Sequence, residues 1–400
     1  MQYRKLTPDG PDISLLGYGC MRFPSKGGSI DKVIAFEQMK YAFDRGVNYY
    51  DTAFPYHGGK SEVVLGEFVK KFDIRHKVHI ADKLPAFLVN KPEQIEGFFN
   101  TQLQRLDTDY IDFYLMHALS CLEDWEKLKS LGILEFIDDK KQSGAIRFIG
   151  FSFHGKPQEF IKILEDYEWD FCQIQYNYLD EHNQAGTAGL KRAYEKGVGV
   201  VVMEPLRGGA LAAKAPDKVK QILAENHEQF SSAYWALRFV MNRKEVGTVL
   251  SGMNVLNHIK ENIHVAKKTL PNSMTDEQLK VINQIKKVYR ELMKVPCTGC
   301  NYCMPCPFGV DIPGTFSDYN SKYFFGNSML TRVMYIGRSV GFFGEKKSGA
   351  DLCVSCGKCV KQCPQYIPIP SKLKEAHKEL DNPIISGSMT IAKKFMKPKN

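Results

Sequence analysis

Features that would place the chain outside the cytoplasm are missing from its sequence. Met1–Gly19 lacks the apolar core of a secretory signal. No apolar run approaches the roughly 20 residues that a membrane-spanning helix needs. There is no tandem repeat beyond two cysteine clusters, and no low-complexity tract. We therefore expect a cytoplasmic protein without a membrane partner.

Common nucleotide and nucleic-acid signatures are also missing. No G-x-G-x-x-G follows a strand-like run, which argues against a Rossmann domain. Gly59–Ser61 resembles the end of a phosphate loop, but Phe54 stands where that motif needs glycine. The net charge is a modest +9, and the basic residues are dispersed except at the C-terminus: Lys393, Lys394, Lys397 and Lys399. We interpret this C-terminal stretch as a solvated tail and expect no nucleic-acid partner.

Eight short apolar runs alternate with amphipathic stretches over the first two thirds of the chain. Helical spacing of apolar residues marks Lys32–Arg45, Lys91–Leu106 and Ser231–Asn242. Repeated strand–helix units with apolar strands predict a parallel sheet covered by helices, and eight units predict a closed α/β barrel, the (β/α)8 or TIM barrel. An active site is then expected at the C-terminal strand ends. The runs are Leu15–Gly19, Val47–Thr52, Val78–Lys83, Ile111–His117, Ile146–Ser152, Phe171–Asn177, Val198–Pro205 and Val246–Gly252.

The composition changes abruptly after Pro296, where cysteine, proline and glycine become frequent. A chain of 400 residues holds one barrel of roughly 250 residues and a second, smaller domain. We expect a barrel over residues 1–270, a connecting helix over 271–296, a small ferredoxin-like α+β or helical iron–sulfur domain over 297–370, and the tail over 371–400.

Eight of the eleven cysteines lie in two clusters near the C-terminus. Without a secretion signal, clustered thiols are typical of metal ligands. The second cluster has the bacterial ferredoxin spacing, in which three close thiolates bind one iron–sulfur cluster and the fourth binds the other. The first cluster is one residue shorter before its last cysteine. The candidate ligands are Cys297, Cys300, Cys303 and Cys306, then Cys353, Cys356, Cys359 and Cys363.

Eight thiolates match two 4Fe-4S clusters. With the crossover rule, Cys363 joins the first three cysteines and Cys306 joins the later three, although the shortened spacing leaves the position of Cys306 open. Zinc is the alternative metal, since four-cysteine zinc sites also use C-x2-C pairs. The clusters could carry single electrons, for which a redox partner protein is one option, or could only stabilise the small domain.

Four polar residues stand at the ends of neighbouring predicted strands: Asp51, Tyr56, Lys83 and His117. An ammonium beside a phenol favours phenolate and so lowers the phenol pKa, while a carboxylate fixes the ammonium. A tyrosine tuned in this way can protonate a carbonyl oxygen as hydride arrives. The four residues together predict a proton-transfer site, which none of them would predict alone.

An ordered series of motifs over roughly residues 1–265 resembles the aldo-keto reductase family. It includes Leu16–Met21, Asp51–Tyr56 with Ser61–Glu62, Asp112–His117, and Glu204–Gly209. The resemblance implies that Tyr56 is the general acid and Lys83 its pKa-lowering partner. It also implies that Asp51 anchors Lys83 and that His117 orients the carbonyl group of the substrate.

The same resemblance implies a nicotinamide nucleotide site on the barrel. Relatives that prefer the 2′-phosphate often carry Lys and Arg in the loop Ser251–Asn254 and at His258, and this sequence does not. We therefore expect NADH or a loose cofactor preference rather than strict NADPH use, with Arg207 or Lys260 as alternative sources of charge. The expected nucleotide-binding residues are Gly19, Cys20, Met21, Ser152, Gln173, Met203, Pro205, Leu206, Arg207, Gly209, Ser251, Gly252, Met253, His258, Glu261 and Asn262.

Two functions remain in view. The first is an enzyme that reversibly reduces a small aldehyde or ketone with nicotinamide hydride, with the iron–sulfur clusters in an electron-transfer or structural role. The second is an iron–sulfur electron-transfer or regulatory protein whose barrel binds nicotinamide as a sensor or scaffold. Residue types do not choose the substrate or the oligomeric state.

Overall fold

The computed structural model describes residues 1–212, 215–226, 230–325, 328–342 and 346–396. Its contacts divide the chain into two units. Unit 1 comprises Met1–Leu206 and Ala233–Thr275, and unit 2 comprises Arg207–Ser232 and Asp276–Asn400. The domain boundaries drawn from the sequence stay a prediction. Among the described residues, no helix has the length and apolar character needed to cross a lipid bilayer.

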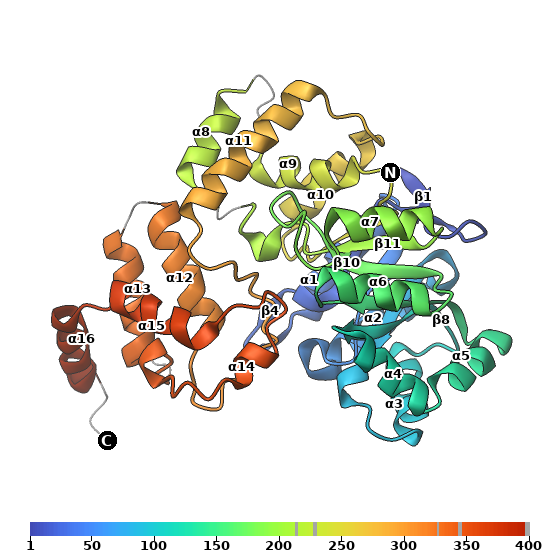
Figure 1. Ribbon diagram of the computed structural model, residues 1–400, viewed down its shortest axis with the longest axis horizontal. Coiled ribbons are helices and arrows are strands. Elements are labelled where there is room, and N and C mark those ends of the chain that lie inside the picture. Colours follow the sequence, from blue (N-terminus) through green and yellow to red (C-terminus); the bar gives the residue numbers. More distant parts are fainter. Residues whose placement is uncertain (213–214, 227–229, 326–327, 343–345, 397–400) are drawn as a thin grey trace. The chain divides into compact units, whose positions relative to one another are not determined.

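Unit 1 is built on a closed barrel of eight parallel strands, which confirms the predicted fold (Figure 1). Each predicted apolar run overlaps one barrel strand, and β7, β8 and β9 extend one or two residues beyond their runs. In spatial order the barrel runs β10-β11-β12-β3-β6-β7-β8-β9. The strands are β3 (Leu16–Gly19), β6 (Tyr49–Asp51), β7 (His79–Leu84), β8 (Ile111–Leu119), β9 (Ile146–Phe153), β10 (Phe171–Gln175), β11 (Gly199–Met203) and β12 (Thr248–Ser251).

Helices follow the barrel strands, as the amphipathic stretches predict. Gly46 and Gly197 end two of these helical segments with φ of 92° and 79°, a left-handed conformation that glycine adopts without a side-chain clash. Two hairpins, β1–β2 (Tyr3–Lys5, Asp12–Ser14) and β4–β5 (Ser25–Lys26, Ser29–Ile30), accompany the barrel. The helices are α1 (Lys32–Phe43), α2 (Lys60–Lys71), α3 (Glu93–Leu106), α4 (Leu122–Ser130), α5 (Ile133–Gln142), α6 (Pro157–Asp166), α7 (Gly186–Glu195), α9 (Ser232–Met241) and α10 (Leu256–Lys268).

Side chains fill the inside of the barrel. Tyr49 of β6, Phe113 of β8 and Phe171 of β10 are fully buried in one cluster, which Leu6 and Ile13 from the N-terminal segment join. The ring of Phe113 lies 5.3 Å from that of Tyr49 and 5.2 Å from that of Phe171. A barrel interior packed in this way is a core rather than a channel, so ligands are left to the strand ends.

The register of the strands brings the C-terminal ends of β3, β6, β7 and β8 together. Gly19 pairs with Asp51, Asp51 pairs with Ala81, and Lys83 pairs with Leu115. Polar residues at these positions therefore stand at one rim of the barrel, where parallel barrels hold their active sites.

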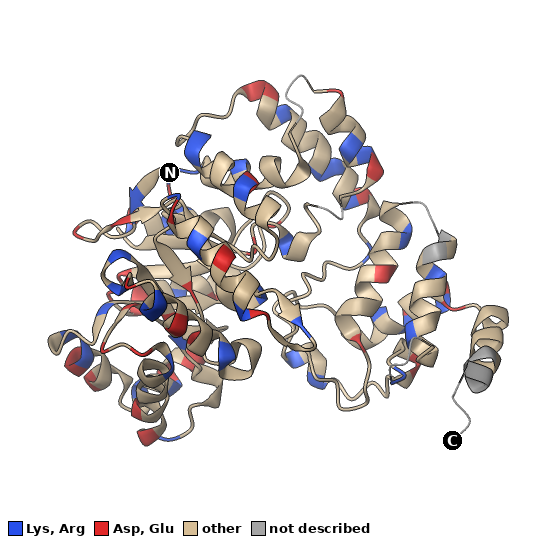
Figure 2. Ribbon diagram, turned by 180° about the vertical axis from the view of Figure 1, so that it is seen from behind, with Lys and Arg blue, Asp and Glu red and all other residues tan. Residues whose placement is uncertain are grey.

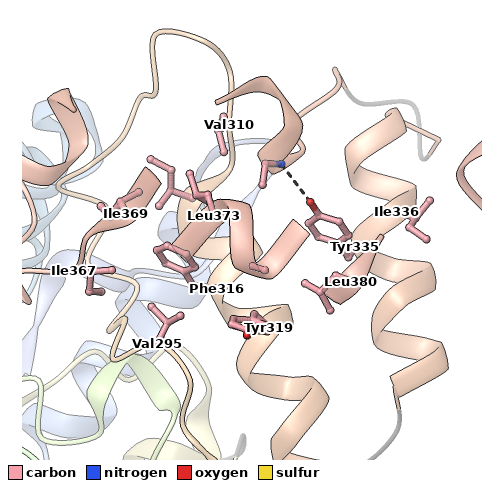
Figure 3. Packing of buried hydrophobic residues seen from close by; sticks show 13 residues of the cluster. Val295, Val310, Phe316, Tyr319, Tyr335, Ile336, Ile367, Ile369, Leu373 and Leu380 are labelled. Carbon is pink, nitrogen blue, oxygen red and sulfur yellow. Dashed lines mark hydrogen bonds between the residues drawn. The ribbon is translucent and has the colours of Figure 1, made fainter. Parts of the chain in front are cut away.

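Unit 2 consists, in its described residues, of helices joined by turns. Its core contains Val295, Phe316 and Leu373 (Figure 3). Tyr335 is also buried there, and its hydroxyl accepts a hydrogen bond from the backbone N–H of Ala350 at 3.4 Å (Figure 3). The helices are α8 (Asp217–Ala224), α11 (Asp276–Leu292), α12 (Ile312–Phe324), α13 (Ser328–Val340), α14 (Lys358–Lys361), α15 (Ile369–Leu380) and α16 (Pro383–Met396).

The segment 371–400, expected as a tail, differs from that expectation because most of it is helical. Leu373, Ala376 and Leu380 of α15 are buried in the core of unit 2, so apolar residues at helical spacing attach this segment. The side chains of the four basic tail residues lie outside the described residues. Elsewhere, basic and acidic residues are interspersed along the outer helices of unit 1 (Figure 2), as is usual for solvated helix faces.

Candidate functional site

A buried ion pair lies at the rim of the barrel. The Nζ of Lys83 donates to Oδ2 of Asp51 at 2.6 Å and to the backbone carbonyl of Thr52 at 2.6 Å. The Lys83 side chain is fully buried and the Asp51 side chain is 4% exposed. A buried ammonium needs such partners, because leaving either charge unpaired would cost several kcal/mol. The two predicted residues therefore form one unit.

Tyr56 and His117 complete the predicted group of four. Tyr56 begins the short helix η2 (Tyr56–Gly59), in the turn that follows β6, and its ring centre lies 5.2 Å from Nζ of Lys83. The ring centres of Tyr56 and His117 are 6.1 Å apart, with the rings nearly perpendicular at 81°. The structure thus brings the four residues together, each from the strand end or turn that the sequence predicts.

The net effect on the pKa of Tyr56 is opposite to the prediction. Burial raises the pKa of Tyr56 well above its ordinary value, and the charges of Asp51 and Glu204 raise it further. Burial and these two carboxylates outweigh the ammonium of Lys83, because low-polarity surroundings disfavour the phenolate. Tyr56 is therefore a protonated phenol near neutral pH, which is the form that a proton donor needs.

Burial also fixes the protonation states of the neighbouring residues. Burial lowers the pKa of His117 well below its usual value, with further lowering from Lys83 and His154, so its imidazole is neutral near pH 7. Burial raises the pKa of Asp51, while the charge and hydrogen bond of Lys83 act against this shift. A neutral imidazole can donate one hydrogen bond to a carbonyl oxygen without competing for the proton of Tyr56.

An irregularity in the sheet positions His117. The register between β8 and β9 shifts between Met116 and Leu119, and Ala118 has a φ of 59°. The backbone N–H of Ala118 donates to a side-chain oxygen of the neighbouring strand β9, Oγ of Ser152, at 2.7 Å. Bulges of this kind are frequent beside active sites, where they redirect a side chain.

Three of the expected nucleotide-binding residues lie on adjacent strands. Ser152 of β9 pairs in register with Gln173 of β10, and the Gln173 amide donates to the sulfur of Met203 on β11 at 3.5 Å. Gln173 is 2% exposed, and no donor among the described residues reaches its Oε1. A buried amide oxygen in this state fits an incoming N–H, such as that of a nicotinamide carboxamide.

The loop after β12 is held from two sides. Oγ of Ser251 accepts a hydrogen bond from Nδ2 of Asn262 at 3.0 Å. The Tyr18 hydroxyl donates to the carbonyl of Met253 at 3.1 Å. A side chain at Gly252 would lie 3.0 Å from Cβ of Arg22, so the Arg22 stem packs on this glycine. The structure thus adds a guanidinium-bearing residue to a loop that carries no basic residue of its own.

The other expected nucleotide-binding residues are divided between the two units. Gly19 ends β3, and the short helix η1 (Cys20–Arg22) follows it. The first two turns of α10 carry His258, Glu261 and Asn262. Arg207 and Gly209 belong to unit 2, where Arg207 contacts the Met293 sulfur and donates to the Pro296 carbonyl at 3.2 Å. The remaining unit 1 members of this set are Cys20, Met21, Pro205, Leu206, His258 and Glu261.

The eight clustered cysteines form two groups in unit 2, and each group mixes the two sequence runs. A small cavity of about 20 Å³ is lined by Cys297, Cys300, Cys303 and Cys363, among others. Burial raises the pKa of Cys303 to about 12, and the three other thiols lining this cavity contribute to that rise. Cys363 therefore lies with the early run, which is the expected crossover arrangement.

The second group includes the cysteine whose position the short spacing left open. Burial raises the pKa of Cys359, and the neighbouring thiols of Cys353, Cys356 and Cys306 raise it further. Cys306 thus stands with the later run despite its shortened spacing. Two groups of four thiols fit 4Fe-4S clusters, which take four cysteine ligands each.

Sequence reasoning assigned no role to two buried carboxyl groups, one of which directly precedes Lys83 in the chain. Glu62 of α2 and Asp82 of β7 are both fully buried. Asp82 directly precedes Lys83 in β7. A second charged residue inside a predicted apolar strand is the signal that could have indicated a buried carboxyl group.

Comparison with known proteins agrees with this geometry. The family model described as "Aldo/keto reductase family" matches residues 15–286. The chain belongs to the aldo/keto reductase family. A second model, described as "4Fe-4S dicluster domain", matches residues 296–367. The chain is therefore an oxidoreductase of this family with a C-terminal 4Fe-4S domain, and these assignments imply a nicotinamide cofactor and iron–sulfur clusters.

Similar proteins cover the barrel part of the chain. An uncharacterized oxidoreductase, YqkF, of Bacillus subtilis is 24% identical over 72% of this chain and 97% of its own length. An NADH-specific methylglyoxal reductase of Escherichia coli is 26% identical over 65% of this chain and 92% of its own. Among solved structures, the holo form of the aldo-keto reductase AKR11C1 of Bacillus halodurans has a TM-score of 0.59, at 24% identity over 71% and 96% of the two chains, and supports the fold.

Proposed function

We propose that this aldo/keto reductase reduces a small aldehyde or ketone to an alcohol, in a reversible reaction, at the rim of its barrel. One observation carries the proposal: the Lys83–Asp51 ion pair at 2.6 Å lies beside the Tyr56 ring, 5.2 Å from Nζ, with His117 facing that ring. A bound nicotinamide would supply the hydride, and the protein must supply the proton.

In this proposal each of the four residues has one task. Tyr56 donates its proton to the carbonyl oxygen of the substrate, so the carbonyl becomes an alcohol once carbon has received hydride. Lys83 stabilises the phenolate that remains, and Asp51 holds Lys83 in place. His117 donates a hydrogen bond that orients the carbonyl. In the reverse direction the phenolate of Tyr56 accepts the proton of the alcohol.

Nicotinamide would be held by Ser152 and Gln173, whose buried Oε1 suits the carboxamide N–H, and by the loop after β12. We propose NADH as the preferred cofactor, because Ser251–Asn254 carries no basic side chain to pair with a 2′-phosphate. The Escherichia coli relative, NADH-specific by its name, supports this preference. Arg22, packed on Gly252, is the residue that would favour NADPH instead.

For the second domain we propose two 4Fe-4S clusters, one in each group of four cysteines. Thiolates would hold the iron, and the clusters would supply one-electron transfer. Because hydride carries two electrons, the proposed carbonyl reduction does not pass through them. Their role is structural or directed at a redox partner protein.

The test is carbonyl-dependent oxidation of NADH by anaerobically purified protein, with clusters intact and after chelation of the iron. A panel of aldehydes and ketones is added while absorbance of NADH and of the clusters is followed separately. We expect NADH oxidation only when a carbonyl compound is present, at similar rates in both samples. Bleaching of the clusters by NADH without alcohol formation would instead indicate an electron-transfer or regulatory protein.

A further inference from the structure

Glu62 and Asp82 form a buried carboxyl pair that the proposed reduction does not use. Both side chains are 0% exposed, one at the start of α2 and the other in β7. Two adjacent carboxylates in a buried place repel each other and lack water, so both cannot stay ionised without strong compensation.

Each carboxyl group has one oxygen with a partner and one without. Oε2 of Glu62 accepts from Nη1 of Arg105 at 2.7 Å, and Oδ1 of Asp82 accepts from the backbone N–H of Lys83 at 2.8 Å. No donor among the described residues reaches Oε1 of Glu62 or Oδ2 of Asp82. The two carboxyl groups themselves lie within hydrogen-bonding reach of each other, and Gln102 also approaches Glu62.

A single proton between the two unpartnered oxygens satisfies both of them. If Oδ2 of Asp82 carries it, this oxygen donates to Oε1 of Glu62, and every oxygen of the pair has a partner. Burial raises the pKa of both groups, but Arg105 opposes the rise at Glu62 whereas the charge of Glu62 adds to it at Asp82. The proton therefore belongs on Asp82, and Glu62 stays ionised against Arg105.

We propose that Glu62 and Asp82 hold one shared proton and act as positioning residues. Because Asp82 is protonated, it adds no negative charge next to Lys83. With Asp82 protonated, Lys83 balances Asp51 and Arg105 balances Glu62. Ionisation of Asp82 would add one negative charge next to Lys83, which would weaken the support that Lys83 gives to a phenolate at Tyr56. This consequence for Tyr56 rests on the proposed function, whereas the shared proton does not.

Charged and titratable groups surround the pair from every neighbouring element. Among them, the charge of Arg105 acts on Glu62 and the charge of Lys83 acts on Asp82. The groups next to Glu62 or Asp82 are Arg105 of α3, Lys83 of β7, Tyr114 of β8, Tyr56 of η2 and Cys20 of η1.

Infrared spectroscopy of the full-length protein tests the shared proton directly. We expect the wild-type-minus-Asp82→Asn difference spectrum at neutral pH to contain the C=O stretch of a protonated carboxyl group. Asp112→Asn is the matched control, because Asp112 is an equally buried carboxylate held by Arg75 and Arg147, and its difference spectrum should contain carboxylate bands alone. A carboxylate band for Asp82 would overturn the proposal. If Asp82→Asn does not fold, wild-type protein with ¹³C-labelled aspartate should still show the shifted C=O stretch of a protonated aspartate at neutral pH, and the absence of this band would overturn the proposal.

The pH profile of kcat tests the positioning role. The ratio of kcat for Asp82→Asn to kcat for wild type should rise with pH, because the wild-type pair loses its proton and the asparagine cannot ionise. A purely structural role would give a ratio that does not depend on pH, as we expect for Asp112→Asn, and would overturn the role. If wild type reduces no carbonyl compound, the proposed function fails while the infrared result still decides the shared proton.

Discussion

The barrel rim and the cysteine groups position their functional side chains in different ways. At the rim, Asp51 and Lys83 occupy neighbouring parallel strands, and their register and hydrogen bonds hold them together. In unit 2 most of the clustered cysteines stand between helices, Cys359 lies in the four-residue helix α14, and Cys356 is exposed. A site made from strand ends is organised by the fold itself, whereas a site made from turns depends more on the metal that it binds.

The largest effect is expected at the barrel rim, when the proposed proton donor is removed. Tyr56→Phe should lower kcat for carbonyl reduction by about 10²–10⁴-fold, since the hydroxyl contributes through proton transfer. The matched control is Tyr50→Phe, which removes another buried tyrosine hydroxyl. Tyr50 directly precedes Asp51 in β6, and its hydroxyl donates to the Met39 carbonyl at 3.2 Å. The control should lose about 1 kcal/mol of stability and keep its activity. Equal rates for Tyr56→Phe and wild type would remove the proposed acid.

The cysteine groups can be tested by pairing substitutions within and across the two sequence runs. With the crossover arrangement, Cys303→Ser combined with Cys363→Ser damages one cluster, so about half of the iron and sulfide should remain. Cys303→Ser combined with Cys306→Ser damages both clusters, and most of the iron should be lost. The reverse ranking in an iron and sulfide assay would show that each run binds its own cluster. Carbonyl reduction in the barrel should survive in both variants.

Acid should weaken the rim of the barrel through a buried histidine. Burial lowers the pKa of His154 to about 4, although its Nδ1 lies 3.2 Å from Oε1 of Gln184. The unfolded chain, with an ordinary histidine pKa near 6.5, binds the proton more readily, so stability falls as pH drops from about 6.5 to about 4.

The loss from His154 should reach about 3 kcal/mol at the acid end of this window. His154→Gln should reduce the slope of unfolding free energy against pH, measured by urea denaturation. His117 acts in the same direction, so part of the slope should remain. An unchanged slope in His154→Gln would show that His154 titrates normally in the folded protein.

The smallest expected effect concerns cofactor choice. Without basic side chains in Ser251–Asn254, kcat/KM for NADH should exceed that for NADPH by about tenfold, which corresponds to about 1.4 kcal/mol. If NADPH is preferred, Arg22→Ala should remove that preference, because its stem packs on Gly252. A preference for NADPH that survives Arg22→Ala would place the phosphate contact elsewhere.

Much of the fold and of the site could be predicted because it depends on residues that are close together in the sequence. Eight apolar runs predicted eight strands, and polar residues at their ends predicted that Asp51, Tyr56, Lys83 and His117 would meet. The cysteine spacing predicted which thiols would group together, including Cys363 with the early run.

What could not be predicted depends on burial and on distant contacts. The raised pKa of Tyr56 follows from its burial and from nearby carboxylates. Neither cause is visible in the residues next to Tyr56 in the sequence. The pairing of Glu62 with Asp82 joins a helix to a strand through side chains, and the grouping of Arg207–Ser232 with the C-terminal segment is likewise a matter of tertiary contact.

The most direct test of the account is the fate of a label on the cofactor. NADH deuterated at the transferred position is incubated with a reducible aldehyde and with protein whose clusters have been removed, and the product is analysed by mass spectrometry. We predict an alcohol that carries deuterium on the former carbonyl carbon, in the same yield as with intact clusters. An alcohol without deuterium, or one formed only when the clusters are present, would contradict hydride transfer at the barrel rim.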